Sequence, residues 1–329
     1  MNNNTVVIRN YFQMLILFII TFSACKSGSS GHSESNAALP STEKNNGIQF
    51  ALKLMPGAKY YYTTTTETNT KVEVNDQKIK TENNATIGLI YEVLPVTGDS
   101  TVLKITYDKI HIELTDKGDK QVMDAGNTGE EQSTMDKLLG LVKGSSVFIT
   151  LDKKGRIIKT SGSKEITDKV LGGLGMYDDG QTKMMVKEQI GKLVGDDFIE
   201  SNISQGFNFY PDTAVTEGQS WSKKNTSVGD IKLDGVTRYT LSSIDDGIAT
   251  ISIDIHSANN GTNKPIFMMG QQVQADLSQK ADGYFEIEMA TGMLTRAKSK
   301  TVIQGTIQVM TKVVPVEITT KKKLTIKKI

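Results

Sequence analysis

The chain of 329 residues carries 38 lysine and arginine residues against 37 aspartate and glutamate residues, and it contains a single cysteine. This charge balance excludes the basic surface that nucleic-acid binding requires, and one cysteine excludes an intramolecular disulfide framework. The length is enough for one large β domain or for two smaller ones.

The N-terminal segment has the pattern of a bacterial lipoprotein signal. Met14–Ile20 is an apolar run too short to cross a bilayer, which takes ~20 residues, but it has the length of a signal-peptide core. The small residues Ser23 and Ala24 directly precede Cys25. We therefore predict that residues 1–24 are a signal peptide and that Cys25 is lipidated; the alternative is a free cysteine after an uncleaved anchor. Lipidation places the protein in the bacterial cell envelope, as an outer-membrane lipoprotein facing the periplasm or the cell surface, and it excludes Cys25 as a nucleophile.

Residues 25–46 are rich in Ser, Gly, Asn and Glu, which predicts a flexible tether. From residue 47 onward the apolar residues recur with a period of two, which is typical of β-strands. A change of phase at Asp108–Lys109 predicts a β-bulge, because a one-residue slip exchanges the two faces of a strand. We expect residues 47–329 to form a single β-rich domain.

The middle of the chain has a helical pattern instead. Ser133 is placed to cap a short helix that ends before Gly144, and two further helices are predicted over residues 164–171 and 181–194. A β-hairpin is predicted over residues 147–159, between the first two helices. The fold class expected is therefore mainly β (α+β): a large curved antiparallel sheet or half-barrel with two or three short helices inserted mid-chain.

The strand pattern returns with Trp221 and continues to the end of the chain. Gly57 is followed three residues later by the aromatic Tyr60, and Gly218 is followed in the same way by Trp221. Each pair is followed by a hairpin of similar shape. This suggests two related halves, residues 47–160 and 203–329, joined by the helical segment. The alternative is the general likeness of β-meanders.

Residues that would carry catalysis or bind a metal are few. The chain has three histidines, of which His256 shares a strand face with Asp254, a pair we interpret as a solvated surface pair. No nucleophile elbow, P-loop or dinucleotide fingerprint occurs. We predict no catalytic residues, no metal site and no cofactor, and therefore a protein that is not an enzyme; a hydrolase with dispersed carboxylates is a less favoured alternative.

Two further features of the second half bear on function. The apolar run Ile266, Phe267, Met268 and Met269 follows a Gly- and Pro-containing stretch and is expected in a loop. It is interpreted either as a flap over one end of the sheet or as a loop that contacts a hydrophobic ligand. The basic patch of Lys321–Lys323 and Lys327–Lys328 is interpreted as the charged surface of an edge strand, which discourages aggregation; the alternative is binding of nucleic acid or lipid head groups.

Four motifs carry a resemblance to a known family: Met55–Tyr60, Leu151–Arg156, Phe209–Pro211 and Val215–Trp221. On these residues the chain resembles a family of uncharacterised Bacteroidetes lipoproteins, whose relaxed lipoboxes are also similar to the segment before Cys25. More distantly, the layout resembles outer-membrane lipoprotein carriers, in which a curved sheet shelters acyl chains. The resemblance implies a location and a fold and assigns no activity.

These observations favour a lipid-anchored, non-enzymatic binding module of the cell envelope for a hydrophobic or lipid ligand. The alternative is a structural, adhesion or assembly subunit of the envelope. The expected partners are the membrane, reached through the lipidated N-terminus, and either a hydrophobic ligand or another envelope protein, with no nucleic acid.

Overall fold

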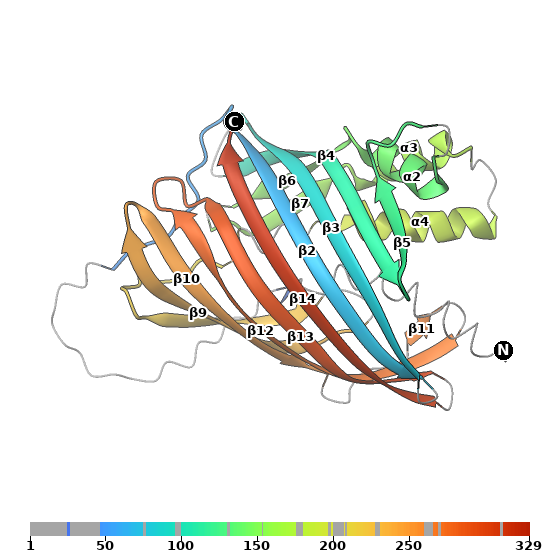
Figure 1. Cartoon of the computed structure of the whole chain (residues 1–329). Coiled ribbons are helices and arrows are strands. Elements are labelled where there is room, and N and C mark those ends of the chain that lie inside the picture. The colour runs from blue at the N-terminus through green and yellow to red at the C-terminus, as the bar shows by residue number, and fades with distance from the viewer. Residues whose placement is uncertain are drawn as a thin grey trace.

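A computed structural model of the whole chain gives the arrangement of the elements (Figure 1). It describes residues 25–26, 47–74, 77–95, 100–129, 132–152, 154–175, 180–196, 199, 207, 209–227, 231–259, 266–268, 271–309 and 312–329. All structural statements below concern these residues.

The strands of the first half of the chain are β1 (Cys25–Lys26), β2 (Lys59–Val74), β3 (Gln77–Leu94), β4 (Thr101–Asp116), β5 (Asp119–Asp124), β6 (Ser146–Leu151) and β7 (Ile157–Ser161). Those of the second half are β8 (Ser220–Ser227), β9 (Asp234–Asp245), β10 (Ile248–Ala258), β11 (Ile266–Met268), β12 (Gln271–Glu288), β13 (Leu294–Val309) and β14 (Lys312–Lys328). The helices are α2 (Thr134–Val142), α3 (Ser163–Gly173) and α4 (Gln181–Val194).

All strands belong to one 14-stranded antiparallel sheet in the order β1-β8-β9-β10-β12-β13-β14-β2-β3-β4-β6-β7, with β11 paired to β12 and β5 paired to β4. Apart from β1, which pairs with β8, the strands of each half of the chain form one wing of this sheet. They join where β14 pairs with β2, from Val316 opposite Val72 to Lys328 opposite Tyr60. The predicted mainly β class, with a large curved antiparallel sheet and three short helices mid-chain, is confirmed.

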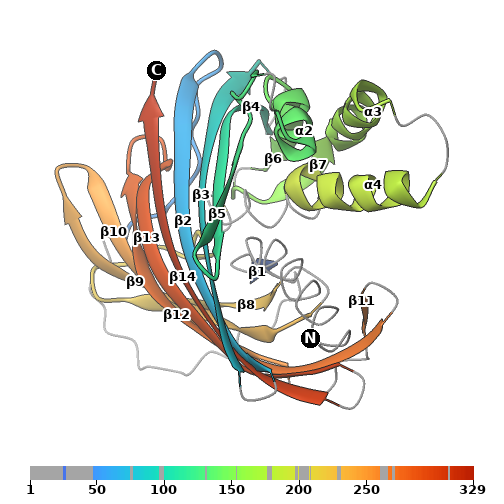
Figure 2. The same cartoon turned by 45° about the vertical axis from the view of Figure 1, so that its right-hand side comes forward.

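The long strands bend together, so that the sheet forms a trough with the three helices on its hollow side (Figure 2). The helices lie near one end of the trough, beside β4, β6 and β7. Long antiparallel strands twist and coil in this way because each strand has an intrinsic right-handed twist. The shape gives the sheet one hollow face and one outer face.

The helices follow the local sequence signals. Ser133 caps α2: its Oγ accepts a hydrogen bond from the Asp136 backbone N–H at 3.0 Å, and the Asp136 carboxylate accepts one from the Ser133 N–H at 3.1 Å. This capping box provides hydrogen-bond acceptors for two backbone N–H groups that have no partner within the helix. The predicted helix boundaries agree with α3 within two residues and with α4 at both ends.

The predicted bulge in β4 is also present. Tyr107 pairs with Leu89 and Lys109 pairs with Gly88, so that Asp108 is the extra residue. The Tyr61 hydroxyl donates a hydrogen bond to Asp108 Oδ2 at 2.7 Å and closes over Gly88, where a Cβ atom would lie 2.5 Å from that hydroxyl. The bulge keeps apolar side chains of β4 on the hollow face on both sides of the phase change.

Two groups of buried apolar residues lie on the hollow face. The larger one, here called the helix-end core, joins strand residues such as Ile105 to helix residues such as Leu139, Val170 and Ile190. The smaller one, here called the far-end cluster, consists of Val72, Ile231, Leu233, Val273, Ala275, Leu277, Ile303, Ile307, Val314, Val316 and Ile318. Nearly all of its members come from the ends of β2, β12, β13 and β14 remote from the helices.

One expectation about the second half is wrong. Lys321–Lys323 were expected on an edge strand, but they lie in β14, which pairs on both sides, with β13 and with β2. The lysine-rich sequence resembles that of an edge strand because Lys321 and Lys323 lie on the outer face of β14. Lys322, between them, points to the hollow face.

Candidate functional site

The hollow face is defined most clearly along β14. Its even-numbered residues from Val314 to Ile326 are buried, with Lys322 partly buried, whereas Lys321 and Lys323 are exposed. Successive side chains of a strand point to opposite faces, so the even-numbered residues line the hollow side. Backbone pairing continues this face through β13 to β12 in one direction and through β2 to β3 in the other.

A row of buried polar side chains crosses this face between the helix-end core and the far-end cluster. Thr320 lies opposite Thr68 and Thr301 on the neighbouring strands, and Thr68 lies opposite Asn83. The next row adds Thr70 opposite Thr81. We call these residues and Gln279 the polar belt: Thr68, Thr70, Thr81, Asn83, Gln279, Thr301 and Thr320 are all buried.

Three members of the polar belt keep polar atoms without hydrogen-bond partners in the described part of the chain. These atoms are Oγ1 of Thr70, Oδ1 and Nδ2 of Asn83, and Oε1 of Gln279. The three residues are only 1%, 2% and 2% exposed. Thr68 and Thr320, in contrast, join their Oγ1 atoms at 3.2 Å. An unpartnered buried polar group costs about 1–3 kcal/mol, so the polar belt lowers the stability of the fold.

Lys322 lies one row from the polar belt, on the side of the helix-end core. Its in-register neighbours across β14 are Thr66 on β2 and Ser299 on β13. The residue as a whole is partly buried, and desolvation of its ammonium group lowers its pKa to about 8. No ion pair joins Lys322 to a carboxylate among the described residues, so its charge is uncompensated within that part of the chain.

A second lysine points to the same face on β8, near the edge of the wing that contains β14. Lys223 on β8 lies opposite Thr237, and its pKa is lowered, mainly by burial. Asp212 opposes that shift, while Lys154 and Arg156 add to it. The ammonium of Lys154 lies 3.6 Å from the Asp212 carboxylate. Other charged groups therefore influence the pKa of Lys223, whereas the pKa of Lys322 is lowered by desolvation alone.

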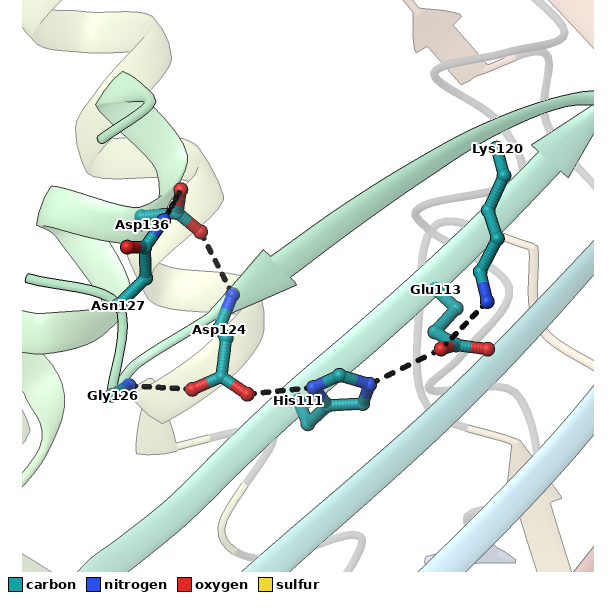
Figure 3. Close-up of polar contacts among 7 residues, drawn as sticks. All are labelled: His111, Glu113, Lys120, Asp124, Gly126, Asn127 and Asp136. Atoms are coloured by element: carbon teal, nitrogen blue, oxygen red, sulfur yellow. Dashed lines mark hydrogen bonds and ion pairs between the residues drawn. The ribbon is translucent and has the colours of Figure 1, made fainter. Parts of the chain in front are cut away.

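A second polar cluster occupies the outer part of β4 (Figure 3). The His111 ring lies between two carboxylates, with Nδ1 2.6 Å from Asp124 Oδ2 and Nε2 3.4 Å from Glu113 Oε1. Lys120 Nζ lies 2.9 Å from the same Glu113 oxygen. Hydrogen bonds from Lys120 and His111 lower the pKa of Glu113, and the bond from His111 lowers that of Asp124. The cluster ties β5 to β4.

The cluster continues into the cap of α2. Asp136, only 4% exposed, accepts hydrogen bonds from the Asp124 backbone N–H at 2.8 Å and from Asn127 Nδ2 at 3.0 Å. The bond from Asp124 is the main reason that the pKa of Asp136 is lowered. Every carboxylate here has partners from neighbouring elements, which is the pattern of a structural joint between β4, β5 and α2.

The residues singled out from the sequence lie apart from one another. Cys25 forms part of β1, which pairs with β8 with Cys25 opposite Ser227; its lipidation stays a prediction. Ile266, Phe267 and Met268 form β11, paired with β12 from Ile266 opposite Val273, rather than a loop. Met269 lies outside the described residues, and a ligand-contacting role for this run stays a prediction.

The His256 ring nitrogen Nε2 lies 2.8 Å from the Asp254 carboxylate, with both side chains about 60% exposed, as expected for a surface pair. In the described part of the chain no three His, Cys, Asp or Glu side chains are grouped as metal ligands. None of the described helices is both long and apolar enough to cross a membrane.

From the sequence, Lys322 was expected only as one of the charged lysines of an edge strand, and the polar belt was not predicted. Lys322 is one of three consecutive lysines, and only its place in the alternation of Thr320, Lys322 and Leu324 distinguishes it. Following the period of two to the end of the chain would have placed Lys322 on the same face as Thr320 and Leu324. The polar belt could not have been predicted in this way, because its rows are set by the pairing of strands that are distant in sequence.

Comparisons with known proteins give a sequence family and solved structures of low identity. A sequence family described as "Family of unknown function (DUF6263)" matches residues 98–294. No curated protein matches the chain. The resemblance to an uncharacterised family is thereby confirmed, whereas the assignment to Bacteroidetes lipoproteins and the likeness to lipoprotein carriers stay predictions.

Among solved structures, the chain is similar to one described as "Lipid-protein interactions in lipovitellin", with 12% identity, a TM-score of 0.45 and coverage of 84% of this chain and 25% of that one. It therefore spans about a quarter of the lipovitellin chain it matches. An outer membrane channel from Pseudomonas putida F1 matches with 9% identity, a TM-score of 0.19 and coverage of 87% of this chain and 100% of that chain. At these TM-scores neither likeness carries an argument.

Proposed function

The chain belongs to the family of unknown function DUF6263, and we propose that it is a non-enzymatic binding module that holds a hydrophobic or lipid ligand against the hollow face of its sheet. The observation that carries the proposal is the composition of this face: apolar clusters on both sides of a belt of buried polar groups with unmade hydrogen bonds. Binding sites for small apolar molecules combine such apolar walls with a few polar groups that fix orientation.

The unpartnered atoms of the polar belt support binding rather than a purely structural role. A sheet selected for stability alone would carry Val or Ile at positions such as Thr70 and Gln279, since an apolar replacement removes the cost of an unmade hydrogen bond. Departures from the rules of stable packing tend to occur at functional sites. A ligand with a polar head group would satisfy the groups that lie beside that head group on binding.

We also propose that the module is anchored to the bacterial cell envelope by a lipid on Cys25, in keeping with the short apolar run, the small residues and the single cysteine. Acyl chains contribute about 0.8 kcal/mol for each buried methylene group, so several chains hold a domain firmly on a bilayer. A Cys25→Ala protein should fail to incorporate labelled fatty acid in its host; labelling equal to that of the wild type would contradict the anchor.

Native mass spectrometry of the full chain, purified from its own envelope in mild detergent, tests the ligand. We expect an added mass that organic solvent extracts. Ala281→Phe provides the blocking variant, because Ala281 is buried on the hollow face of β12 between Thr301 and Ile255. Asp282→Phe is the matched control, because the next residue is exposed on the outer face.

The blocking variant should lose the added mass and the control should keep it. Overpacking costs about 1–3 kcal/mol, so both variants are first checked for cooperative unfolding. A wild-type chain that carries no extractable mass, or an Ala281→Phe chain that folds and retains it, would contradict the proposal.

A further inference from the structure

Resting on the proposed function, we propose that Lys322 is the head-group anchor of the hollow face and binds the carboxylate of a long-chain fatty acid, whose alkyl chain extends toward the far-end cluster. The proposal names the ligand class and the residue that selects it. It stands on the position of Lys322, on its lack of an acidic partner and on the polar belt beside it.

The position of Lys322 is fixed by the register of three strands. Thr66 and Ser299 lie directly opposite it on β2 and β13. Directly opposed residues of an antiparallel pair have Cβ atoms about 4.5–5.5 Å apart, so both hydroxyl groups flank the base of the lysine side chain. An anion held by the ammonium would have hydroxyl donors on both sides.

Two exposed lysines of the outer face provide a contrast. Lys71 on β2 forms an ion pair with Glu317 at 2.8 Å, and Lys59 pairs with Glu92 at 3.4 Å. Lys322 points to the hollow face and has no such partner among the described residues. An isolated charge removed from water is costly unless it is paired, so the hollow face at Lys322 favours an anion from outside the chain.

The surroundings of Lys322 indicate which anion. One ammonium group matches the single negative charge of a carboxylate, and no second basic residue points to this face from the neighbouring strands β2 and β13, where residues 64–68 and 297–301 contribute Thr, Ser and Ala. Asn83 and Thr70 of the polar belt lie one and two rows further along and have free hydrogen-bonding atoms. Head group and lysine would thus be surrounded by hydrogen-bonding groups.

The direction of the alkyl chain follows from the position of the helices. On the helix-end side, face residues such as Tyr62, Leu89 and Leu324 share one core with residues of the helices, whereas the far-end cluster contains no residue of a described helix. In the other direction, β14 continues from Lys322 to Val314, a rise of about 27 Å at ~3.4 Å per residue, past Ile318 and Val316. That length suits a long unbranched chain better than a compact ligand.

The test compares two ligands that differ only in the head group, palmitate and hexadecanol, titrated into the delipidated full chain. Lys322→Met removes the charge and keeps an unbranched side chain, and Lys321→Met changes the exposed neighbour on the outer face. We expect Lys322→Met to weaken palmitate binding by about 10- to 100-fold and to leave hexadecanol binding unchanged, because a charged hydrogen-bonded pair is lost. Lys321→Met should change neither.

A second variant keeps the lysine and supplies an internal partner. Ser299→Glu places a carboxylate opposite Lys322, and it should weaken palmitate binding while hexadecanol still binds. Equal losses for both ligands in both variants, or no loss in either, would overturn the assignment of Lys322. Binding of hexadecyl phosphate that depends on Lys322, with no binding of palmitate, would overturn the choice of a carboxylate.

These outcomes are distinct from failure of the proposed function itself. If the wild-type chain binds neither palmitate nor hexadecanol, the fatty-acid proposal fails, and native mass spectrometry alone decides the proposed function. If it binds both equally tightly and Lys322→Met keeps both affinities, the apolar site stands and the head-group assignment fails.

Discussion

The helix-end core and the polar belt, two regions of the hollow face, are built on different principles. At the helix end, side chains such as Leu103, Leu139 and Val170 are fully buried against one another. At the polar belt, Thr70, Asn83 and Gln279 are as deeply buried, yet part of their hydrogen-bonding capacity is unused. Burial alone therefore does not identify the part of a sheet that stabilises the fold. The packed side chains of the helix-end core increase stability, whereas the unpartnered groups of the polar belt decrease it at the place where a ligand would be held.

The largest effect is expected from truncating the helix-end core. Leu139→Ala should lower the free energy of unfolding by about 3 kcal/mol, because it removes a fully buried side chain of α2 and leaves a cavity. Urea denaturation measures this. The control is Met184→Ala on the exposed face of α4, which should change stability by less than about 0.5 kcal/mol. Similar losses for the two variants would remove the distinction between core and surface in the helical region.

The next effect concerns the joint that fixes α2 to β5. Asp136→Ala should cost about 2–3 kcal/mol at pH 7, since the carboxylate accepts several hydrogen bonds, including those of the cap. Ser133→Ala removes only the cap acceptor and should cost about 1 kcal/mol. Circular dichroism during urea unfolding gives both values, and a larger loss for Ser133→Ala would contradict the ranking.

The same joint should respond to acid. The folded pKa of Asp136 lies below its unfolded value of ~3.9, chiefly through the bond from Asp124. Its contribution is therefore fully present above the unfolded pKa and is lost as the pH falls through the folded pKa. The stability difference between wild type and Asp136→Asn should shrink below pH ~4; a difference that stays constant down to pH 2 would contradict this.

A smaller effect of opposite sign is expected in the polar belt. Thr70→Val removes a buried hydroxyl that has no partner and should raise the free energy of unfolding by about 1 kcal/mol. Thr68→Val on the same strand and face breaks the bond to Thr320 and should lower it by a similar amount. Thermal unfolding of the two variants side by side gives the signs. A destabilised Thr70→Val would show that its hydroxyl is satisfied in the folded protein.

Lys322 should give the unliganded protein a characteristic dependence on pH. Its folded pKa of about 8 lies below the unfolded value of ~10.4, so its cost to stability is greatest below pH 8 and is relieved as the pH rises toward 10. Relative to Lys322→Met, the wild type should gain about 1 kcal/mol between pH 7 and pH 9. Parallel stability curves for the two proteins would contradict a desolvated ammonium.

Much of the fold could be predicted from local signals. Ser133 and the helical stripe after it predict α2, the phase change at Asp108 predicts the bulge, and period-two alternation predicts the long strands. The position of β14 could not be predicted in this way, because pairing with β2 is decided by contacts across nearly the whole chain. Because lysines occupy both faces of β14, its sequence resembles that of an exposed edge strand.

The candidate site was accessible only in part. The expectation of an apolar ligand came from a curved sheet and from the run Ile266–Met269, of which the described residues form β11. The residues that carry the proposal, Lys322 and the polar belt, come from five strands brought together by register. The spacing of residues within one strand does not reveal which residues of other strands will lie beside them.

The most direct test of where the ligand lies is photo-crosslinking with a palmitate analogue that carries a diazirine near the end of its chain. The full chain is labelled, digested and mapped by mass spectrometry. We predict labels on residues of the far-end cluster in β12, β13, β14 and β2, with labelling abolished in Ala281→Phe. Labels confined to exposed apolar residues such as Ile158 and Met184 would show that the hollow face holds no ligand.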